Sequence, residues 1–569
     1  MKHTARPMRK LLALLLCFAM FSALLIPTAS AETTTVDGVE YTLIKTPADL
    51  KAIGSNLGGK YMLANDIVLT ENWAPLNAFT GVLDGNGYAI RNLNIVNAAT
   101  ASWATAGLFK SINGGTVKNL TLYGKLENTA TQSVELGSVA GVAQAGAQII
   151  NCVNNMDLVV KNTAKNPYVG GIVADAKDGV LIRDCVNNGN ISVEAPALAT
   201  HVAGICGTMG QKNNTNADYI ENCVNNGDVT VADGTHASSH ASGILGTVTA
   251  NAAITVTVSN CVNFGDITSG SSYAAGITVA QTTLPSGVSS YPHTISINNC
   301  ANMGSVTARN AAECFAAGII ARPRCSAVTV TNCYNGGQIS APNRTAGYVA
   351  GIAASEGRNA YNDCYSVAQN DFTTYPSKEK FEGASFGLIG YGGYATAFTG
   401  GIIDANTDLD EVLIALQGDA IAPSFRINDG AIEPLYYLNR VNTTMVGAQF
   451  TAVLGGSYSI RFVAVVNKLY DAAGFKVAAT VKAANGDVTN VPETTIGVDE
   501  IYDSLLAITN GAEEAVEAPV GTCYMALKML ELPADATVTF TVTPYTVTDG
   551  VTAAGEAMVF NCTNGGLIY

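Results

Sequence analysis

Acidic side chains that could catalyse polysaccharide cleavage are sparse in this sequence. Hydrolysis would need two carboxylates, and lyase action would need several carboxylates with calcium and a basic residue. Asp184 precedes a recurring cysteine, whereas Asp228 and Asp266 follow a recurring glycine, so the three do not share one repeat position. The sequence therefore displays no catalytic group, although carboxylates of a repeat protein can converge without being neighbours in sequence. We expect a binding protein and keep a polysaccharide-active enzyme as the alternative.

The five histidines could suggest a metal or catalytic site, most of all His236 and His240, but two of the five belong to a periodic aromatic position. His201 and His240 each lie three residues before a Gly-Ile pair. Other repeats carry an aromatic ring at this position, which predicts one column of stacked rings: Tyr168, His201, His240, Tyr273, Phe315 and Tyr348. The position has the parity of the following Ile, so in a regular strand the rings point inward. If a bend intervenes, they form an outward strip suited to stacking on sugars. We expect no cofactor and no metal.

Cysteine and asparagine mark the internal repeat, which recurs about every 35 residues. The cysteines are Cys152, Cys185, Cys223, Cys261, Cys300 and Cys333, with a decayed copy at Cys364, and the asparagines include Asn187, Asn225, Asn263, Asn302 and Asn335. Stacked cysteines would have parallel side chains, so we interpret them as small buried hydrophobes rather than disulfides or metal ligands. We interpret the asparagines as a hydrogen-bonded ladder at a bend where Asn takes a left-handed conformation, with Gly189 and its equivalents as a second such position.

Three short apolar pieces in each repeat predict an all-β solenoid. In one repeat they begin at Gly171, Val180 and Asn190, and turn-forming residues separate them. Three strands and three bends would make one coil, and each coil would bury its inner face against its neighbours.

A family resemblance adds to this prediction. Residues 79–87 read Phe-Thr-Gly-Val-Leu-Asp-Gly-Asn-Gly, and Gly-Ile and Asn-Cys-x-Asn-x-Gly-x-Ile repeats follow them. With the Leu-Tyr-Tyr-Leu segment at 435–438, these motifs resemble the GLUG-type β-helix proteins of secreted bacterial surface chains. The resemblance covers roughly residues 38–440 and implies a right-handed parallel β-helix with an adhesin-like or matrix role.

The chain is expected to divide into five parts. Residues 1–31 form a signal peptide, 32–60 an N-terminal cap with a helix after Thr46, 61–370 the solenoid, and 371–442 a C-terminal cap or linker. Residues 443–569 show long alternating strands typical of an antiparallel β-sandwich accessory domain. Cys523 and Cys562 lie there as a candidate disulfide pair.

The leader and the charge set the expected location and partners. A basic segment, an apolar run from Leu11 to Ile26 and small residues before Glu32 predict export with cleavage after Ala31. No later segment is apolar enough to span a membrane. The net charge of −15 argues against nucleic acid as a partner.

Variable loops supply the expected contact surface. The spacing from Gly-Ile to the next cysteine varies most, which places insertions on one edge, where recognition loops usually lie. The candidate binding residues are Asn213, Asn214, Tyr219, Tyr291 and His293. The sequence thus predicts a secreted or surface protein that binds a glycan or an extracellular protein, with loop drift as the alternative explanation.

Overall fold

The computed structural model describes most of the chain after residue 31. The described residues are 32–36, 38–98, 102–161, 166–194, 199–210, 216–233, 239–249, 253–280, 291–310, 313–323, 325–343, 346–354, 359–369, 388–389, 397–417, 425–428, 430–434, 443–453, 457–467, 472–498, 501–502, 522–528, 536–548, 551–555, 557–563 and 566–568. The predicted signal peptide lies outside them.

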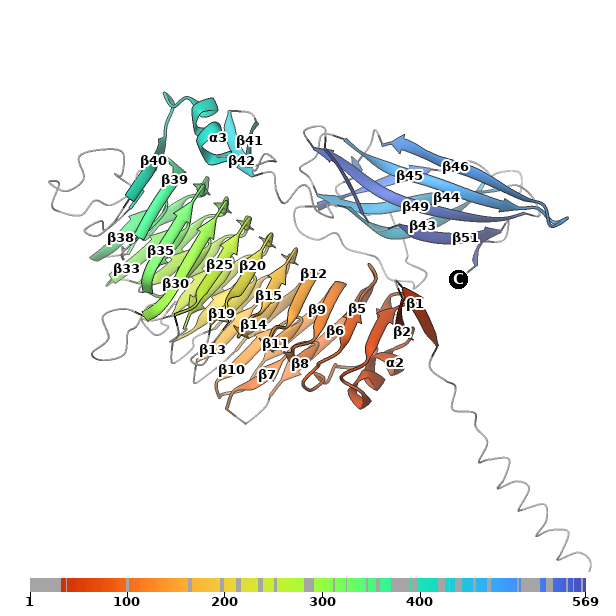
Figure 1. Ribbon diagram of the computed structural model, residues 1–569, viewed down its shortest axis with the longest axis horizontal. Helices are drawn as coiled ribbons and strands as arrows, with labels where there is room; N and C mark the ends of the chain where they lie inside the picture. Colours follow the sequence, from red (N-terminus) through yellow and green to blue (C-terminus); the bar gives the residue numbers. More distant parts are fainter. Residues whose placement is uncertain are drawn as a thin grey trace, which may run out of the picture.

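Successive coils of the chain stack along one axis, and their strands form the three parallel sheets of the solenoid (Figure 1). Sheet 1 has 25 strands, sheet 2 has eight, and sheet 3 has seven. Strands of neighbouring coils pair in parallel and in register, as when Tyr168 pairs with His201 and His201 with His240. The predicted parallel β-helix is therefore confirmed, while its handedness stays a prediction.

The coil of residues 167–193 shows the order in which the chain passes through the three sheets. Strand β13 (Pro167–Gly170) belongs to sheet 2, β14 (Val173–Lys177) to sheet 3, and the next three strands belong to sheet 1: β15 (Leu181–Arg183), β16 (Val186–Asn187) and β17 (Ile191–Val193). The coil has three sides, but they are not the three predicted pieces. The pieces that begin at Val180 and Asn190 both lie in sheet 1, where bends separate them, and the sheet 2 strand had no predicted piece of its own. Asp184, at φ 58°, makes the bend between β15 and β16.

The other coils repeat this order with the following bounds. Sheet 2 also contains β7 (Ala104–Ala106), β10 (Val134–Gly137), β18 (His201–Ala203), β23 (His240–Ser242), β28 (Tyr273–Ala275), β33 (Glu313–Ala317) and β38 (Ala346–Ala350). Sheet 3 also contains β8 (Phe109–Asn113), β11 (Ala140–Gln144), β19 (Cys206–Met209), β24 (Leu245–Val248), β29 (Thr278–Ala280) and β34 (Ile320–Arg322). Sheet 1 continues with β20 (Asp218–Glu221), β21 (Val224–Asn225), β22 (Val229–Val231), β25 (Thr255–Ser259), β26 (Val262–Asn263), β27 (Ile267–Ser269), β30 (Tyr291–Asn298), β31 (Ala301–Asn302), β32 (Val306–Ala308), β35 (Cys325–Thr331), β36 (Tyr334–Asn335), β37 (Ile339–Ser340), β39 (Asn359–Val367) and β40 (Ala397–Ile403).

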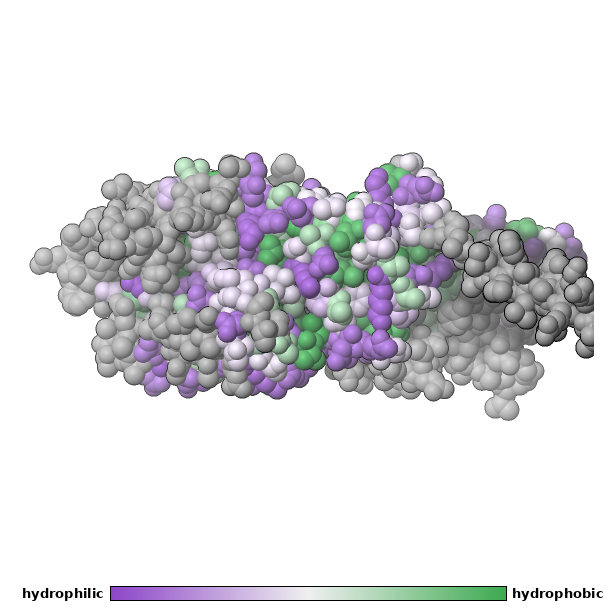
Figure 2. Space-filling view, turned by 90° about the horizontal axis from the view of Figure 1, so that it is seen from below, coloured by the Kyte–Doolittle hydropathy of each residue, from purple (hydrophilic) through white to green (hydrophobic). Residues whose placement is uncertain are grey.

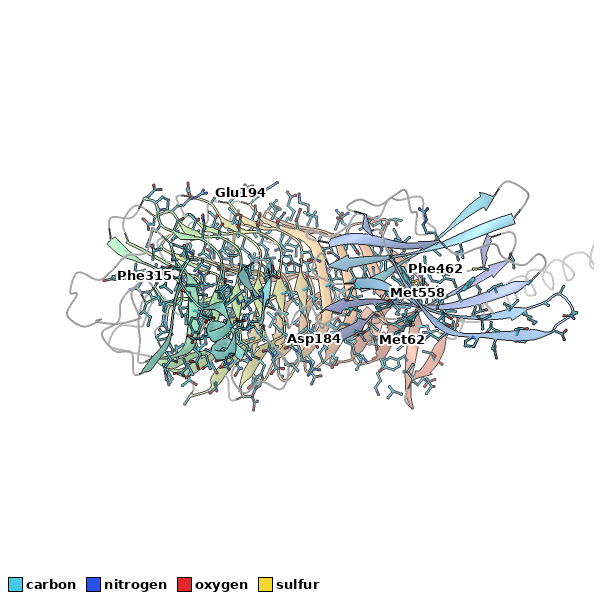
Figure 3. All side chains as sticks on the ribbon, turned by 90° about the horizontal axis from the view of Figure 1, so that it is seen from above. Met62, Asp184, Glu194, Phe315, Phe462 and Met558 are labelled. Atoms are coloured by element: carbon cyan, nitrogen blue, oxygen red, sulfur yellow. The ribbon has the colours of Figure 1, made fainter. Side chains whose placement is uncertain are left out.

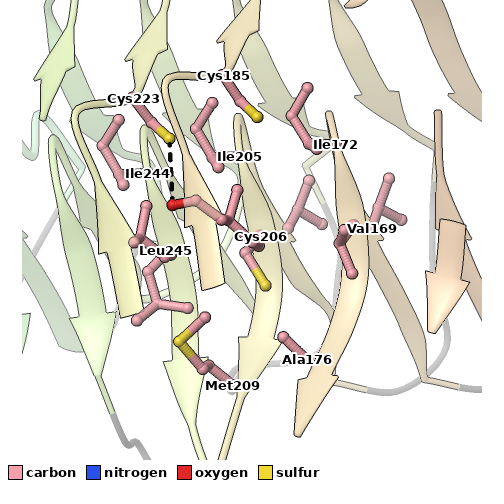
Figure 4. Packing of buried hydrophobic residues seen from close by; sticks show 14 of the residues in the cluster. Val169, Ile172, Ala176, Cys185, Ile205, Cys206, Met209, Cys223, Ile244 and Leu245 are labelled. Carbon is pink, nitrogen blue, oxygen red and sulfur yellow. Dashed lines mark hydrogen bonds between the residues drawn. The ribbon is translucent and has the colours of Figure 1, made fainter. Parts of the chain in front are cut away.

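Aliphatic side chains and thiols fill the interior of the coils. Ile172, Ile205 and Ile244 stack on successive coils, and Cys185 and Cys223 lie beside them in Figure 4. The thiol of Cys223 donates to the carbonyl of Ile182 on the preceding coil at 3.7 Å, the bond drawn in Figure 4. The repeat cysteines are fully buried free thiols in the structure.

Two asparagine columns run along the solenoid, and the sequence interpretation gave the left-handed conformation to the wrong one. The residue before each repeat cysteine takes the left-handed conformation, as Asn222 does at φ 59° and Asn260 at φ 52°. The second column is Asn154, Asn187, Asn225, Asn263, Asn302 and Asn335, which is completely buried and shows no positive φ. The expectation that this column takes the left-handed conformation at a bend is therefore wrong; its amides bond along the stack inside the coil.

Gly189 and its equivalents serve close backbone approach rather than positive φ. A methyl group on Gly189 would lie 1.9 Å from the carbonyl oxygen of Met156, and one on Gly227 would lie 2.0 Å from that of Gly189. Neither glycine has a positive φ, so the predicted second left-handed position is also wrong. Glycine is needed here because one coil passes directly over the next.

The Gly-Ile bend between sheets 2 and 3 turns toward the buried asparagines. A methyl group on Gly171 would lie 2.5 Å from Cγ of Asn187, and one on Gly204 would lie 2.2 Å from Cγ of Asn225. The backbone therefore bends toward the interior of the coil at the Gly-Ile pair. As a result, the outward sides of sheets 2 and 3 face each other.

The solenoid begins with a strand pair and a short helix. β1 (Thr33–Val36) pairs antiparallel with β2 (Val39–Ile44), which pairs in parallel with β3 (Lys60–Leu63). Helix α2 (Pro47–Ala52) has a capping box between Thr46 and Asp49, which confirms the predicted helix start, and η1 (Ile53–Ser55) follows. The early coils of sheet 1 are β4 (Ile67–Val68), β5 (Val82–Asp84), β6 (Ala89–Asn97), β9 (Thr116–Asn128) and β12 (Gln148–Val160).

The segment after the last coil lies against the outer side of sheet 1. Helix α3 (Leu409–Gln417) and the hairpin of β41 (Phe425–Asn428) and β42 (Ala431–Pro434) supply Leu416 and Phe425 to an apolar cluster. The cluster also contains Val262 and Tyr334, which point outward from sheet 1. This segment thus covers a flank of the solenoid.

Two antiparallel sheets follow and share one core. The first contains β43 (Thr443–Val453), β44 (Ser457–Asn467), β47 (Ile501–Tyr502) and β48 (Thr522–Lys528). The second contains β45 (Ala472–Lys482), β46 (Val488–Gly497), β49 (Thr537–Thr548), β50 (Val551–Ala554), β51 (Met558–Thr563) and β52 (Gly566–Ile568). Phe462 and Phe540 meet between the sheets at 5.3 Å, which confirms the predicted sandwich.

Candidate functional site

The aromatic column of sheet 2 faces outward, not inward. Val169, Val202 and Ala316 of the same strands belong to the interior cluster. Tyr273 and Phe315 alternate with such residues and belong to a separate cluster with Val279 and Ala321 of sheet 3. The prediction that the rings point inward is wrong because the Gly-Ile bend resets the alternation between the ring and the following Ile. We call the packed region between the outward sides of sheets 2 and 3 the seam.

The rings form a continuous column along the seam. Successive ring centroids lie 4.7 Å apart for Tyr168–His201 and for His201–His240, and 5.6 Å apart for His240–Tyr273. The column continues through Phe315, labelled in Figure 3, to Tyr348 with spacings of 5.5 and 5.8 Å. These spacings are those of favourable edge-on and offset ring contacts, so the column stabilises the stack of coils.

Only the ends of the column reach the surface. His240 is completely buried, and Tyr273 and Phe315 are 5% and 3% exposed. Arg322 covers this middle part, with its guanidinium carbon 4.5 Å from the Phe315 ring centre, and donates a hydrogen bond to the Tyr273 hydroxyl. Tyr168 and His201 at one end, and Tyr348 at the other, are partly exposed. A ligand that stacks on the column must therefore use an end.

Trp103 extends the column at its N-terminal end and is its most exposed ring. Its indole lies 5.1 Å from the Tyr168 ring and is 45% exposed. The backbone has φ 60°, an uncommon conformation for a bulky residue, and its N–H donates to Ser133 O at 2.7 Å. Such strain in a large exposed aromatic residue is typical of functional positions.

Glu135 lies on the coil that this aromatic contact bridges. β10 pairs with β7 on one side and β13 on the other, and Glu135 is in register with Tyr168. Trp103 directly precedes β7, so its contact with Tyr168 passes over the coil of Glu135. Glu135 is 7% exposed, and this burial, together with the nearby Asp175, raises the pKa of its carboxyl to about 8. The side chain is therefore a proton donor at neutral pH.

Asp175 approaches Glu135 from sheet 3. Its side chain is completely buried, and Lys177 Nζ lies 2.9 Å from Oδ2. Burial raises the pKa of the Asp175 carboxyl above its usual value, and the Lys177 ammonium offsets only part of that rise. The two sheets meet closely here: a methyl group on Gly141 would lie 2.6 Å from the Glu135 carbonyl oxygen. The bend thus brings together two acids that lie 40 residues apart in sequence.

Two polar atoms at this end of the seam have no hydrogen-bond partner within the described structure. Thr208 is in register with Asp175 on the next coil, and its buried hydroxyl is unpartnered. The Nδ1 of His201, next to Tyr168, is buried and unpartnered as well. Burial lowers the pKa of His201 to about 4, so its imidazole is neutral. Because a buried polar group without a partner is costly, such atoms suit a ligand or water. We call Trp103, Glu135, Tyr168, Asp175 and Lys177 the acidic end of the seam.

Of the five binding residues predicted on the loop edge, the structure describes the side chains of two. Tyr219 is 39% exposed on the outer side of sheet 1, whereas His293 is completely buried and offers no surface to a ligand. Asn213 and Asn214 lie outside the described residues, as does the side chain of Tyr291. The acidic end of the seam lies on sheets 2 and 3 instead.

The cysteines offer no reactive group in the described part of the chain. Burial raises the pKa of the thiols of Cys185, Cys261 and Cys300, which keeps them protonated. Cys562 is a free thiol that points into the sandwich core, with its pKa raised to about 12 by burial. The candidate Cys523–Cys562 disulfide is therefore not formed; the side chain of Cys523 lies outside the described residues.

Other site classes find no support among the described residues. No group of three His, Cys, Asp or Glu side chains is placed to hold a metal ion in this part of the chain. The described helices include none long and apolar enough to cross a membrane. On the face seen in Figure 2, hydrophilic and hydrophobic residues are interspersed over the described part of the solenoid.

Fold and site together define a parallel β-helix protein with a C-terminal antiparallel sandwich. No family model matches the chain, so the GLUG-type resemblance stays a prediction. An alignment 113 residues long with halomucin of Haloquadratum walsbyi shows 38% identity and covers 17% of this chain and 1% of that protein. A crystal structure described as a candidate immunoglobulin A1 protease from Bacteroides ovatus is 15% identical, with TM-score 0.34, over 70% of this chain and 94% of that one.

Proposed function

We propose that the chain is an extracellular binding protein whose acidic end of the seam holds a neutral glycan. The supporting observation is the 45% exposed Trp103 ring, which makes an edge contact with Tyr168 next to the coil of Glu135. Aromatic rings bind the apolar faces of sugar rings, and a protonated carboxyl can both donate to and accept from sugar hydroxyls. Since the chain carries a net charge of −15, neutral glycans are favoured over acidic ones.

The sequence supports the extracellular location in this proposal. Residues 1–31 have the composition of a signal peptide, and the local similarity to halomucin is in keeping with an extracellular role. Amino-terminal sequencing of the protein secreted by its host should begin at Glu32. An intact amino terminus on cell-associated protein would contradict export.

Glycan binding can be measured with the two tryptophans of the chain. Trp73 is 3% exposed and Trp103 is 45% exposed, so a sugar on the seam should change the fluorescence of Trp103 alone. Titration of the mature chain with neutral oligosaccharides should give saturable binding, and Trp103→Ala should weaken it about tenfold on a glycan array.

Tyr219→Ala is the matched control, because Tyr219 is also an exposed aromatic residue but lies on sheet 1. This variant should bind as well as the wild type. Loss of binding in Tyr219→Ala with full binding in Trp103→Ala would move the contact surface to the predicted loop edge. Failure of every neutral glycan to bind would remove the proposal.

A further inference from the structure

We propose that Glu135 and Asp175 act as general acid and general base in hydrolysis of a glycosidic bond of the glycan bound at the acidic end of the seam. The inference rests on the proposed glycan binding and adds a reaction to it. Four features carry the inference. Two acids come from facing sheets, and the Trp103–Tyr168 contact bridges the coil of Glu135. A lysine pairs with the other acid, and the Thr208 hydroxyl on the next coil has no partner in the described structure.

The two carboxyl groups have different surroundings, as acid and base roles require. Glu135 lies beneath the contact between Trp103 and Tyr168, and no cation lies within ion-pair distance of it in the described structure. Asp175 has the Lys177 ammonium at 2.9 Å, which favours its ionised form. Since Lys177 pairs with Asp175 and not with Glu135, the geometry favours the proton on Glu135 and the negative charge on Asp175.

The aromatic contact between Trp103 and Tyr168 would place a bound sugar next to Glu135. A pyranose ring that stacks on Trp103 would lie next to the coil of Glu135, since the Trp103–Tyr168 contact bridges that coil. Glu135 retains 7% exposure and can reach a glycosidic oxygen, whereas Asp175 has none. Asp175 is thus too recessed to bond to the sugar and is suited to act through a water molecule. The unpartnered Thr208 hydroxyl on the next coil can hold that water.

The reaction that follows is direct displacement by water. Glu135 gives its proton to the glycosidic oxygen as the bond from that oxygen to the anomeric carbon breaks, and the leaving sugar departs as an alcohol. The water oxygen bonds to the anomeric carbon while its proton passes to the Asp175 carboxylate. Solvent then returns one proton from Asp175 to Glu135, which restores both groups.

The test uses the full mature chain with neutral polysaccharides (mannan, galactan, xylan and mixed-linkage glucan) and measures released reducing ends. Glu135→Gln keeps the shape and hydrogen bonding of the protonated acid and should lower the rate at least about 100-fold. The same variant should still cleave 2,4-dinitrophenyl glycosides, whose leaving group needs no proton. Asp175→Asn should lose activity on both kinds of substrate.

A pH profile gives a readout that a merely structural role would not move. The wild-type rate should fall above about pH 8, where Glu135 loses its proton; Asp175 and Lys177 from β14 and Tyr168 from β13 are the titratable groups facing it. Glu135→Gln should lack this decline. Glu127→Gln is the control, because Glu127 is a partly exposed acid of sheet 1 paired with Lys161 at 3.0 Å, and it should leave the rate unchanged.

The outcomes separate this inference from the proposed binding function. A wild-type chain that binds an oligosaccharide through Trp103 but releases no reducing ends overturns the inference and leaves binding intact. Hydrolysis that Glu135→Gln and Glu127→Gln reduce equally also overturns it, provided circular dichroism shows both variants folded. A chain that neither binds nor cleaves removes both proposals.

Discussion

The buried asparagine ladder should contribute far more to stability than an identical residue one position away. Asn225 Nδ2 donates to Asn263 Oδ1 at 2.7 Å and to the Gly227 carbonyl at 2.8 Å. Its Oδ1 accepts from Asn187 Nδ2 at 2.7 Å. Asn225→Ala removes all three bonds inside a coil where water cannot replace them. Each buried partner left unsatisfied costs about 1 kcal/mol or more, so the variant should lose about 3–5 kcal/mol with the cavity included.

The neighbouring residue supplies the control. Asn226 is only partly buried and donates a single side-chain bond, to Asn188 Oδ1 at 2.7 Å. Asn226→Ala should therefore lose no more than about 1 kcal/mol. Urea unfolding followed by circular dichroism measures both variants, and hydrogen exchange of residues 218–231 shows whether the loss begins in the altered coil, as stacked repeats allow. Equal destabilisation by the two substitutions would refute the role assigned to the ladder.

Two further predictions follow from buried titratable groups. Burial lowers the pKa of His201 to about 4 from 6.5, so the unfolded chain takes up this proton first, and stability is lost as the pH falls from about 6.5 to 4; His201→Phe should reduce that loss, measured as urea midpoints at pH 7 and 4.5, and an unchanged difference would contradict it. The eleven cysteines whose side chains the structure describes are buried free thiols, so Ellman's reagent should label them only after denaturation; rapid labelling of a repeat cysteine in the native chain would show that the coils open.

The stacking of coils could be predicted from the sequence because every coil needs the same residue at the same place. A cysteine, asparagine or ring that recurs at one position must pair with its own kind on the next coil, and His201 indeed pairs with Tyr168 and His240. Periodicity identifies such columns without saying which way they face. The direction of the rings depends on Gly204 approaching Asn225, a contact between residues far apart in the coil. That contact bends the chain and resets the alternation, which no local pattern records.

The acidic end of the seam could not be predicted from the sequence, for a related reason. No later repeat carries a tryptophan like Trp103 or an acid at the position of Glu135, so alignment on the cysteines passes over them. Asp175 occupies a position that is Thr208 and Thr247 on the following coils, and a single acid at a Thr position looks like ordinary drift. The signal that could have pointed there is the first departure from a repeat: an acid replaces the ring at Glu135, on the coil before the column begins at Tyr168. In a solenoid whose regular positions are committed to stacking, irregular positions on adjoining coils are where a ligand site can form, because only they are free of the ladders.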